Sequence, residues 1–343
     1  MKFLKPKPRK NPVPLAVAVA IVVVVGLLVW YLATHSIPVF QPTGVTGAKE
    51  RSLIDFALIL SVIVVVPTFA LTIYIVWKYR EGKHDSNTKY KPDFDHSVLF
   101  ESVWWGVPII IIGILSVVTW RSAHSLDPYQ KIASSQPALN IQVVSLDWKW
   151  LFIYPEQNVA SVNYFVIPAG RPVHFSVTSD SVMNSFWVPS LGGQIMAMPG
   201  MNTQIYEEAT KPGVTYGSSA NISGTGFARM RFSTSAVSHL AFNNWISRLK
   251  ASPLELNVAA YQKLAEPNVL KSTANYAPVQ PGLFNQIIMQ YMMPGMSLDK
   301  QSAGSKSGGS MIMPNTVQTE QKAKAPANCG NISPLNKEVF IRC

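Results

Sequence analysis

The sequence predicts an integral membrane protein in which two or three membrane helices precede a β-rich domain outside the inner membrane. Charged residues make up only 14% of the 343 residues, whereas globular proteins carry about 25%. Three long apolar runs lie before residue 121, and from about Leu139 short β-branched and aromatic segments alternate with glycine and proline. These observations predict a fold class that combines membrane α-helices with an all-β domain.

The first apolar run extends from Leu15 to Ala33 and contains no charged residue. It follows five basic residues: Lys2, Lys5, Lys7, Arg9 and Lys10. A signal sequence and a retained anchor helix both fit this pattern. The run exceeds the apolar core of about 7–15 residues that signal sequences carry, which favours a retained helix. The mature protein would then have three membrane helices, or two if the first is cleaved.

The second and third apolar runs set the orientation. They extend from Phe56 to Trp77, with Pro67 inside, and from Val103 to Trp120, with tryptophans at both rims as in interfacial aromatic belts. The segment between them is basic, with Lys78, Arg80, Lys83, Lys89 and Lys91. Because basic loops stay in the cytoplasm, everything after Arg121 is expected outside.

The β-rich region reaches from about Leu139 to Val237. Its strand-like segments are Ile141–Val144, Val162–Ile167, Val173–Thr178 and Met230–Ser233. Short strands with regular turn signals predict a sandwich or barrel. After Ser238, apolar residues recur at helical spacing in Phe242–Leu249, Leu254–Leu264 and Leu283–Met293, and residues 301–328 have the composition of a flexible tail.

Three sequence blocks occur in a characteristic order. They are HSVLFESVWWGVP at His96–Pro108, SLDWKWLFIYPEQ at Ser145–Gln157, and SVMNSFWVPSLGGQIMAMPGM at Ser181–Met201, followed by YGSSANISGTGFARM at Tyr216–Met230. The stretch from Glu50 to Met296 resembles subunit II of the haem–copper terminal oxidases. The resemblance implies a cupredoxin-like Greek-key β-barrel after the membrane helices, followed by a C-terminal helical arm.

In the cytochrome c oxidases of this family the barrel holds a dinuclear copper centre, CuA. The matching positions here are Asn184 and Phe227 for the histidines, Ser219 and Ser223 for the cysteines, Asn221 for the backbone carbonyl and Met230 for the methionine. Only Met230 is kept. Thiolates and imidazoles are the ligands that copper needs, and a serine hydroxyl does not replace a thiolate. The outer domain is therefore expected to bind no metal and no other cofactor.

This pattern resembles the quinol oxidase branch of the family, the cytochrome bo type. The resemblance implies a proton-translocating ubiquinol:oxygen oxidoreductase in which this chain is a structural subunit without a redox centre. Haems and one copper would belong to subunit I. The implied partners are subunit I, the smaller subunits, membrane lipid and, through the complex, ubiquinol; cytochrome c is not expected to bind. The location would be the bacterial inner membrane, multi-pass, with the large C-terminal domain periplasmic.

The predicted organisation has five parts. They are an N-terminal signal or anchor helix (1–36), a membrane helical hairpin (50–125), a periplasmic cupredoxin-like domain lacking CuA (136–237), a helical arm (238–297) and a flexible tail (298–343). The formal charge of +11 does not indicate nucleic-acid binding, because many basic residues flank apolar runs. Cys329 and Cys343 lack a CxxC partner, and a disulfide and two separate thiols both remain open.

Glu101, just before the third run, is the one residue with a predicted direct role. An acid at a helix N-terminus is favoured by the helix dipole, while the resemblance places this position at the mouth of a proton path into subunit I. Trp148 and Trp150 are expected to pack between the barrel and subunit I, and His174 to be a hydrogen-bonded strand residue. No catalytic residue is predicted in this chain.

One alternative function belongs to a different class. The methionines Met289, Met292, Met293, Met296, Met311 and Met313 could bind copper(I) in a freestanding copper-binding or sensory membrane protein. Methionine also fills gaps in helix packing, so the pattern alone does not decide. The sequence does not identify the haems, the preferred quinone or the role of the tail after Gln301.

Overall fold

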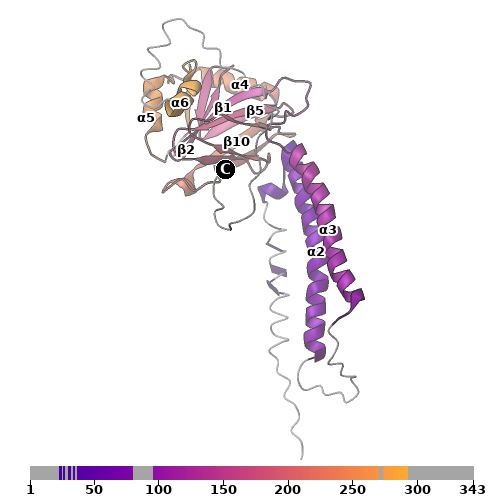
Figure 1. Ribbon diagram of the computed structural model, residues 1–343. Coiled ribbons are helices and arrows are strands. Elements are labelled where there is room, and N and C mark those ends of the chain that lie inside the picture. Colours follow the sequence, from indigo (N-terminus) through magenta and orange to yellow (C-terminus); the bar gives the residue numbers. More distant parts are fainter. Residues whose placement is uncertain are drawn as a thin grey trace, which may run out of the picture. The chain divides into compact units, whose positions relative to one another are not determined.

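The computed structural model describes residues 37–79, 96–269 and 273–292, together with a few residues between 23 and 34 (Figure 1). Most of the first apolar run, the basic segment around Lys83 and the tail with Cys329 and Cys343 lie outside these residues. The predictions made for those segments therefore stay predictions.

Two long helices precede the β-domain. The short helix η1 (Pro38–Phe40) is followed by α2 (Val45–Tyr79) and α3 (Val98–Ser125). Val45–Lys78 and Val98–Ser125 have the length and apolar composition of membrane spans, with mean hydropathies of 2.6 and 2.1. Both helices are longer than the apolar runs in the sequence. Helix α2 begins well before Phe56 because its first turns pack on the β-domain, as Gly47 N–H donates to Leu191 O at 2.7 Å.

The β-domain is a two-sheet, cupredoxin-like sandwich. The six-stranded sheet has the order β11-β3-β2-β1-β5-β8 and the five-stranded sheet the order β4-β10-β9-β6-β7. The first sheet contains β1 (Leu139–Leu146), β2 (Lys149–Tyr154), β3 (Val159–Val162), β5 (Val173–Ser179), β8 (Thr203–Glu207) and β11 (Ala274–Tyr276). The second contains β4 (Tyr164–Pro168), β6 (Asn184–Trp187), β7 (Gln194–Ala197), β9 (Gly213–Ser219) and β10 (Arg231–Val237), with the short helix η2 (Phe227–Arg229) before β10. The pairs β1–β5 and β4–β10 are parallel, and the other described pairs are antiparallel.

One predicted strand divides in two. The segment expected as a single strand from Val162 to Ile167 is broken at Asn163, whose φ of 61° is left-handed. The Asn163 side-chain oxygen accepts the Trp150 backbone N–H at 2.9 Å, which holds the turn. Because of this turn, β3 joins the six-stranded sheet and β4 joins the five-stranded one.

Strand β2 is buried on both faces. Trp150, Phe152 and Tyr154 face the core between the two sheets, whereas Leu151 and Ile153 face a second core. Strands buried on both faces read as nearly continuous apolar runs, which explains the sequence KWLFIY. The second core is closed by the C-terminal arm.

The arm consists of α4 (His239–Lys250), α5 (Val258–Ala265) and α6 (Leu283–Met292). The predicted helix start at Leu254 is wrong. Helix α5 begins at Val258 because the Asn257 side chain accepts the Ala260 N–H at 2.9 Å and caps the first turn. Strand β11 also lies within this region and pairs with β3 at the edge of the six-stranded sheet.

Candidate functional site

Five of the six positions that the sequence resemblance matches to copper ligands lie close together: Asn184, Ser219, Asn221, Ser223 and Met230. Asn184 begins β6, Ser219 ends β9, and Met230 lies between η2 and β10. Asn184 and Met230 are buried, and Ser219 is 6% exposed. Residues distant in sequence therefore form one cluster, as the residue-by-residue match requires.

Hydrogen bonds connect this cluster. The Ser219 hydroxyl donates to the Asn184 side-chain oxygen, and the Asn184 amide nitrogen donates to Ser145 Oγ at 2.9 Å. The same amide nitrogen lies 3.8 Å from Met230 Sδ, and the Ser223 hydroxyl lies 3.9 Å from that sulfur. Ser219 Oγ also lies 3.3 Å from the Asn221 carbonyl oxygen. The polar atoms of the cluster thus find their hydrogen-bond partners within the protein.

The chemistry of these donors does not suit a dinuclear copper centre. Hydroxyls and side-chain amides are hard, neutral donors, and Met230 supplies the one soft sulfur among the matched positions. Within the described ranges, no group of three or more His, Cys, Asp or Glu side chains could hold a metal ion. The interior of the cluster is instead held together by hydrogen bonds.

Four further residues belong to this network and were not predicted. Besides Ser145, the Ser185 hydroxyl contacts Met196 Sδ at 2.9 Å and lies 3.2 Å from Asn221 Oδ1, and it accepts a hydrogen bond from Gln194 Nε2 at 3.1 Å. Apart from Met196, these residues are polar and lie on otherwise apolar strands, and this pattern could have indicated the network. Phe227, at the second histidine position, begins η2 and is half-buried.

Trp148 and Trp150 have different surroundings, and the prediction that both pack against subunit I is wrong for Trp150. Trp150 has no exposed surface and packs edge-on against Phe186 and Phe232, with ring centroids 5.6 and 5.7 Å away. Trp148 is half-buried, and its indole N–H donates to Ser223 O at 3.1 Å. Only Trp148 retains surface that a neighbouring subunit could contact.

Lys149, which lies between these two tryptophans in the sequence, joins β2 to the arm through hydrogen bonds. It is fully buried, and its Nζ donates to Glu266 O at 2.7 Å and to Asn268 Oδ1 at 2.8 Å. Burial lowers the pKa of Lys149, and the carboxylates of Asp147 and Glu266 partly oppose that shift. The sequence alone gave no reason to place a lysine inside a protein interface.

Asp180 is the acidic counterpart of Lys149 on the same interface. Its carboxylate accepts hydrogen bonds from Tyr261 of α5 and from Gln290 and Tyr291 of α6, the last at 2.9 Å. Burial raises the pKa of Asp180, although the hydrogen bond from Tyr261 and those from the other two donors oppose the rise. Three donors from two helices therefore converge on one carboxylate.

Glu101 lies in the first turn of α3. Its carboxylate oxygen Oε1 is 2.7 Å from His96 Nδ1, and both side chains are at least half exposed. His174, in contrast, contacts Asn140 Oδ1 and Gln204 Oε1 at 3.0 and 3.2 Å and stacks on Tyr206. His174 is thus held by hydrogen bonds within the sheet.

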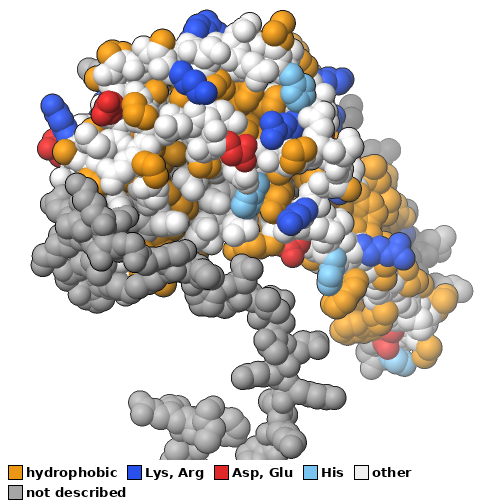
Figure 2. Space-filling view, turned by 90° about the horizontal axis from the view of Figure 1, so that it is seen from above, with side chains coloured by type: hydrophobic (Ala, Val, Ile, Leu, Met, Phe, Trp, Pro, Cys, Tyr) orange, Lys and Arg blue, Asp and Glu red, His pale blue; other side chains and the backbone are white. Residues whose placement is uncertain are grey.

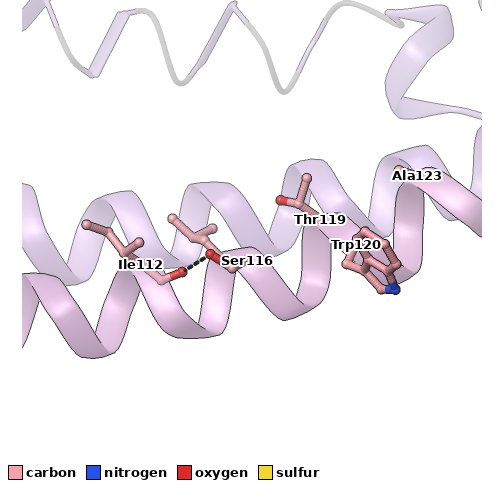
Figure 3. A pocket seen from close by; sticks show the side chains of 6 residues that line it. Ile112, Ser116, Thr119, Trp120 and Ala123 are labelled. Atoms are coloured by element: carbon pink, nitrogen blue, oxygen red, sulfur yellow. Dashed lines mark hydrogen bonds between the residues drawn. The ribbon is translucent and has the colours of Figure 1, made fainter. Parts of the chain in front are cut away.

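The membrane helices carry shallow apolar grooves. One, of about 380 Å³, follows α3 along Ile112, Ser116, Thr119, Trp120 and Ala123 (Figure 3), and the Ser116 hydroxyl donates to Ile112 O at 2.8 Å. Another, of about 390 Å³, lies between α2 and α3 beside Phe56 and Leu115. Small residues in such grooves let a neighbouring helix approach closely.

On the face of the β-domain in Figure 2, basic and acidic side chains are scattered without a continuous patch of one sign.

Comparisons with known proteins agree with this geometry. Residues 157–237 match the periplasmic domain of cytochrome c oxidase subunit II, and residues 250–295 match the COX aromatic rich motif. The cytochrome bo(3) ubiquinol oxidase subunit 2 of Pseudomonas aeruginosa is 46% identical over 253 residues, 74% of this chain and 76% of that protein. The ubiquinol oxidase subunit 2 of Acetobacter aceti is 43% identical over 300 residues, 87% of this chain and 92% of that protein.

Among solved structures, the periplasmic domain of cytochrome oxidase subunit II of Bradyrhizobium japonicum is 25% identical, with a TM-score of 0.32. It covers 34% of this chain and 96% of that one.

The fold and the family matches define a membrane-anchored protein with a periplasmic domain of the oxidase subunit II class. Within that class, the chain belongs to the family of ubiquinol oxidase subunit 2. These relatives do not support the alternative of a freestanding copper-binding or sensory protein. Of its six methionines, Met293, Met296, Met311 and Met313 lie outside the described residues.

Proposed function

We propose that this chain is subunit II of a proton-translocating ubiquinol oxidase complex of the cytochrome bo type. The observation that carries the proposal is the cluster of Asn184, Ser219 and Met230, in which hydrogen-bonded amides and hydroxyls occupy the copper-ligand positions. Ubiquinol is dissolved in the bilayer and can deliver electrons within the membrane. Such a complex needs no copper relay in its outer domain.

The role of the chain is structural. It binds no cofactor, covers the outer face of subunit I and crosses the inner membrane more than once, with its C-terminal domain in the periplasm. The groove on α3 supports this role, since Ser116 and Ala123 leave room for a neighbouring helix. Haems and copper belong to subunit I, and Trp148 is the tryptophan of the DWKW motif that is available for that interface.

The test is purification of the intact complex through a tag on this chain, followed by haem and metal analysis and oxygen-uptake assays. We expect haem and one copper per complex, with uptake driven by ubiquinol and not by reduced cytochrome c. The Met230→Leu variant is a matched control, because it removes the one retained ligand and should leave the copper content unchanged. Additional copper that Met230→Leu removes, or oxidation of cytochrome c, would refute the proposal.

Glu101 is proposed as a proton-entry residue for subunit I. Its carboxylate, half exposed beside His96 at the beginning of α3, supports this role, because water can reach it. Glu101→Gln should slow ubiquinol-driven turnover while the complex assembles normally. A purely structural helix-end acid predicts the opposite: unchanged turnover and a slightly less stable α3.

A further inference from the structure

The first turn of α2 is joined to the β-domain mainly through backbone atoms. Gly44 N–H donates to Ser190 O at 3.0 Å, Gly47 N–H to Leu191 O at 2.7 Å, and Val45 N–H to Glu208 O at 3.1 Å. A side chain on Gly44 would overlap the backbone of Leu191. We call this region, residues 43–50 with residues 190–193 and 207–210, the α2 junction.

Two carboxyl groups meet inside the α2 junction. Glu50 Oε1 accepts the Gly193 backbone N–H at 2.9 Å. Glu207 Oε1 approaches the same glycine and would lie 2.5 Å from a Cβ built there. Glu207 is 2% exposed, and neither of its carboxyl oxygens has a hydrogen-bond partner of acceptable geometry.

No basic side chain neutralises this pair among the described residues. Arg51, the nearest arginine on α2, pairs with Asp55 at 3.6 Å, and Lys49 is exposed. Tyr206 on β8 and Glu208 directly after the strand alternate with Glu207 and therefore face the other side of the sheet. His174 on the neighbouring β5 also faces that side, where it stacks on Tyr206.

A buried carboxylate without a partner is strongly unfavourable, and a second negative charge nearby makes it more so. Burial raises the pKa of Glu207 well above its ordinary value of 4.5, and the charge of Glu50 raises it further, while the Thr46 hydroxyl lowers it. Glu50, in contrast, accepts a hydrogen bond from the Gly193 backbone N–H. The two carboxyls are thus unequal.

We propose that Glu207, packed beside the carboxyl group of Glu50, is a binding site for a single proton at the α2 junction. Release of the proton to water leaves two negative charges side by side and loosens the contact between α2 and the β-domain. The site goes beyond the proposed function and does not depend on which electron donor the complex oxidises.

The sign of the pH dependence follows from the raised pKa. The unfolded or opened site binds fewer protons than the closed site between pH 4.5 and the pKa of the closed state. Opening therefore becomes more favourable as the pH rises, by up to about tenfold per pH unit for one proton. Above the pKa of the closed site the dependence levels off.

Hydrogen–deuterium exchange of the purified complex tests this proposal. After correction for intrinsic exchange rates, we expect peptides covering residues 43–50 and 190–194 to exchange at least several-fold faster at pH 9 than at pH 6. The Glu207→Gln variant keeps the shape of the protonated acid and should show no such increase. Glu208→Gln, which removes the neighbouring carboxylate on the opposite face of the strand, should behave like the wild type.

Infrared spectroscopy gives a second readout at pH 7. The spectrum of the wild type minus that of Glu207→Gln should contain a protonated carboxyl band, and the spectrum of the wild type minus that of Glu208→Gln should not. If Glu207→Gln does not assemble, Glu50→Gln should show a smaller increase in exchange between pH 6 and pH 9 than the wild type. Equal exchange at both pH values in the wild type, or an equal increase in Glu207→Gln, would overturn the proposal.

Discussion

The two faces of the six-stranded sheet are covered in different ways. The inner face meets the second sheet in a core rich in aromatic rings, where Phe186 and Phe232 stack with centroids 5.5 Å apart. The outer face meets α5 and α6 of the arm in a core of mainly aliphatic residues, bordered by the buried Lys149 and the half-buried Asp180. The inner core depends on shape, whereas the arm is also held by directed hydrogen bonds.

This difference shows how an added segment can be positioned on an existing sandwich. Apolar contacts alone are non-directional and leave a helix free to slide. Lys149 holds the loop after α5, and Asp180 holds α5 and α6 together. We therefore expect substitutions in the inner core to destabilise the whole β-domain, and substitutions at the two charged groups to affect the arm.

The largest effect is expected for Phe152→Ala in the inner core. Phe152 has no exposed surface, and its ring centroid lies 4.8 Å from that of Phe165 and 5.2 Å from that of Phe232. Such a truncation lowers the free energy of unfolding by about 3–5 kcal/mol. Denaturant unfolding of the purified protein measures it, with Ile222→Ala, an exposed residue, as the control. A loss below about 1 kcal/mol would contradict tight packing here.

A smaller, local effect is expected for Lys149→Met. Methionine keeps the apolar part of the side chain but removes the Nζ donor to Glu266 O and Asn268 Oδ1. Both acceptors belong to exposed residues that water can reach, so we expect a loss of about 1–2 kcal/mol. Limited proteolysis should show faster cleavage within residues 250–292 and unchanged protection of the sandwich. Lys263→Met, at an exposed site on α5, serves as the matched control.

Tyr261→Phe tests the acidic anchor. It removes one of three donors to Asp180, which should cost about 1 kcal/mol of arm stability. Because that hydrogen bond lowers the pKa of Asp180, its loss raises the pKa further. A raised carboxyl pKa means that arm stability decreases as the pH rises from 3.8 towards the pKa in the folded state, and the variant extends this decrease to higher pH. Proteolysis rates across a pH series would show it, and identical profiles would contradict it.

The smallest effect is expected for His174→Gln, on the polar outer side of β5. A substitution at such a site changes stability by about 0.5 kcal/mol or less. Burial lowers the pKa of His174, and the hydrogen bond with Gln204 opposes this shift. The wild type should thus lose slight stability as the pH falls through 6.5, and the variant should lose less. A larger change in thermal unfolding would indicate a role beyond the sheet.

The sequence predicts the membrane helices because their apolar runs are long, and it predicts the segments of β1, β3, β4, β5 and β10 because they are rich in β-branched and aromatic residues. It does not single out the other six strands, among them β11, since Ala274–Tyr276 contains three half-buried residues without a pattern. Asn257 is a residue type that commonly caps the beginning of a helix and therefore indicates the observed start of α5. Pro253, which also favours a helix start, suggested an earlier one.

The residues of the candidate site were likewise only partly predictable from the sequence. The resemblance alone predicts that Asn184, Ser219 and Met230 lie together. Their partner Ser145 could not be predicted, because it reaches Asn184 from the opposite sheet. Glu207 had a visible signal, an acid at a buried position of an alternating strand, whose partner Glu50 depends on tertiary contacts.

The turn between β1 and β2 sends three consecutive side chains to three parts of the protein. Trp148, with a left-handed φ of 62°, reaches the loop at Ser223, Lys149 reaches the arm, and Trp150 enters the inner core. Inserting or deleting one residue after this turn would exchange the two faces of β2 and misplace all three at once. Chain length at this turn should therefore vary far less among functional homologues than the identity of any single exposed residue nearby.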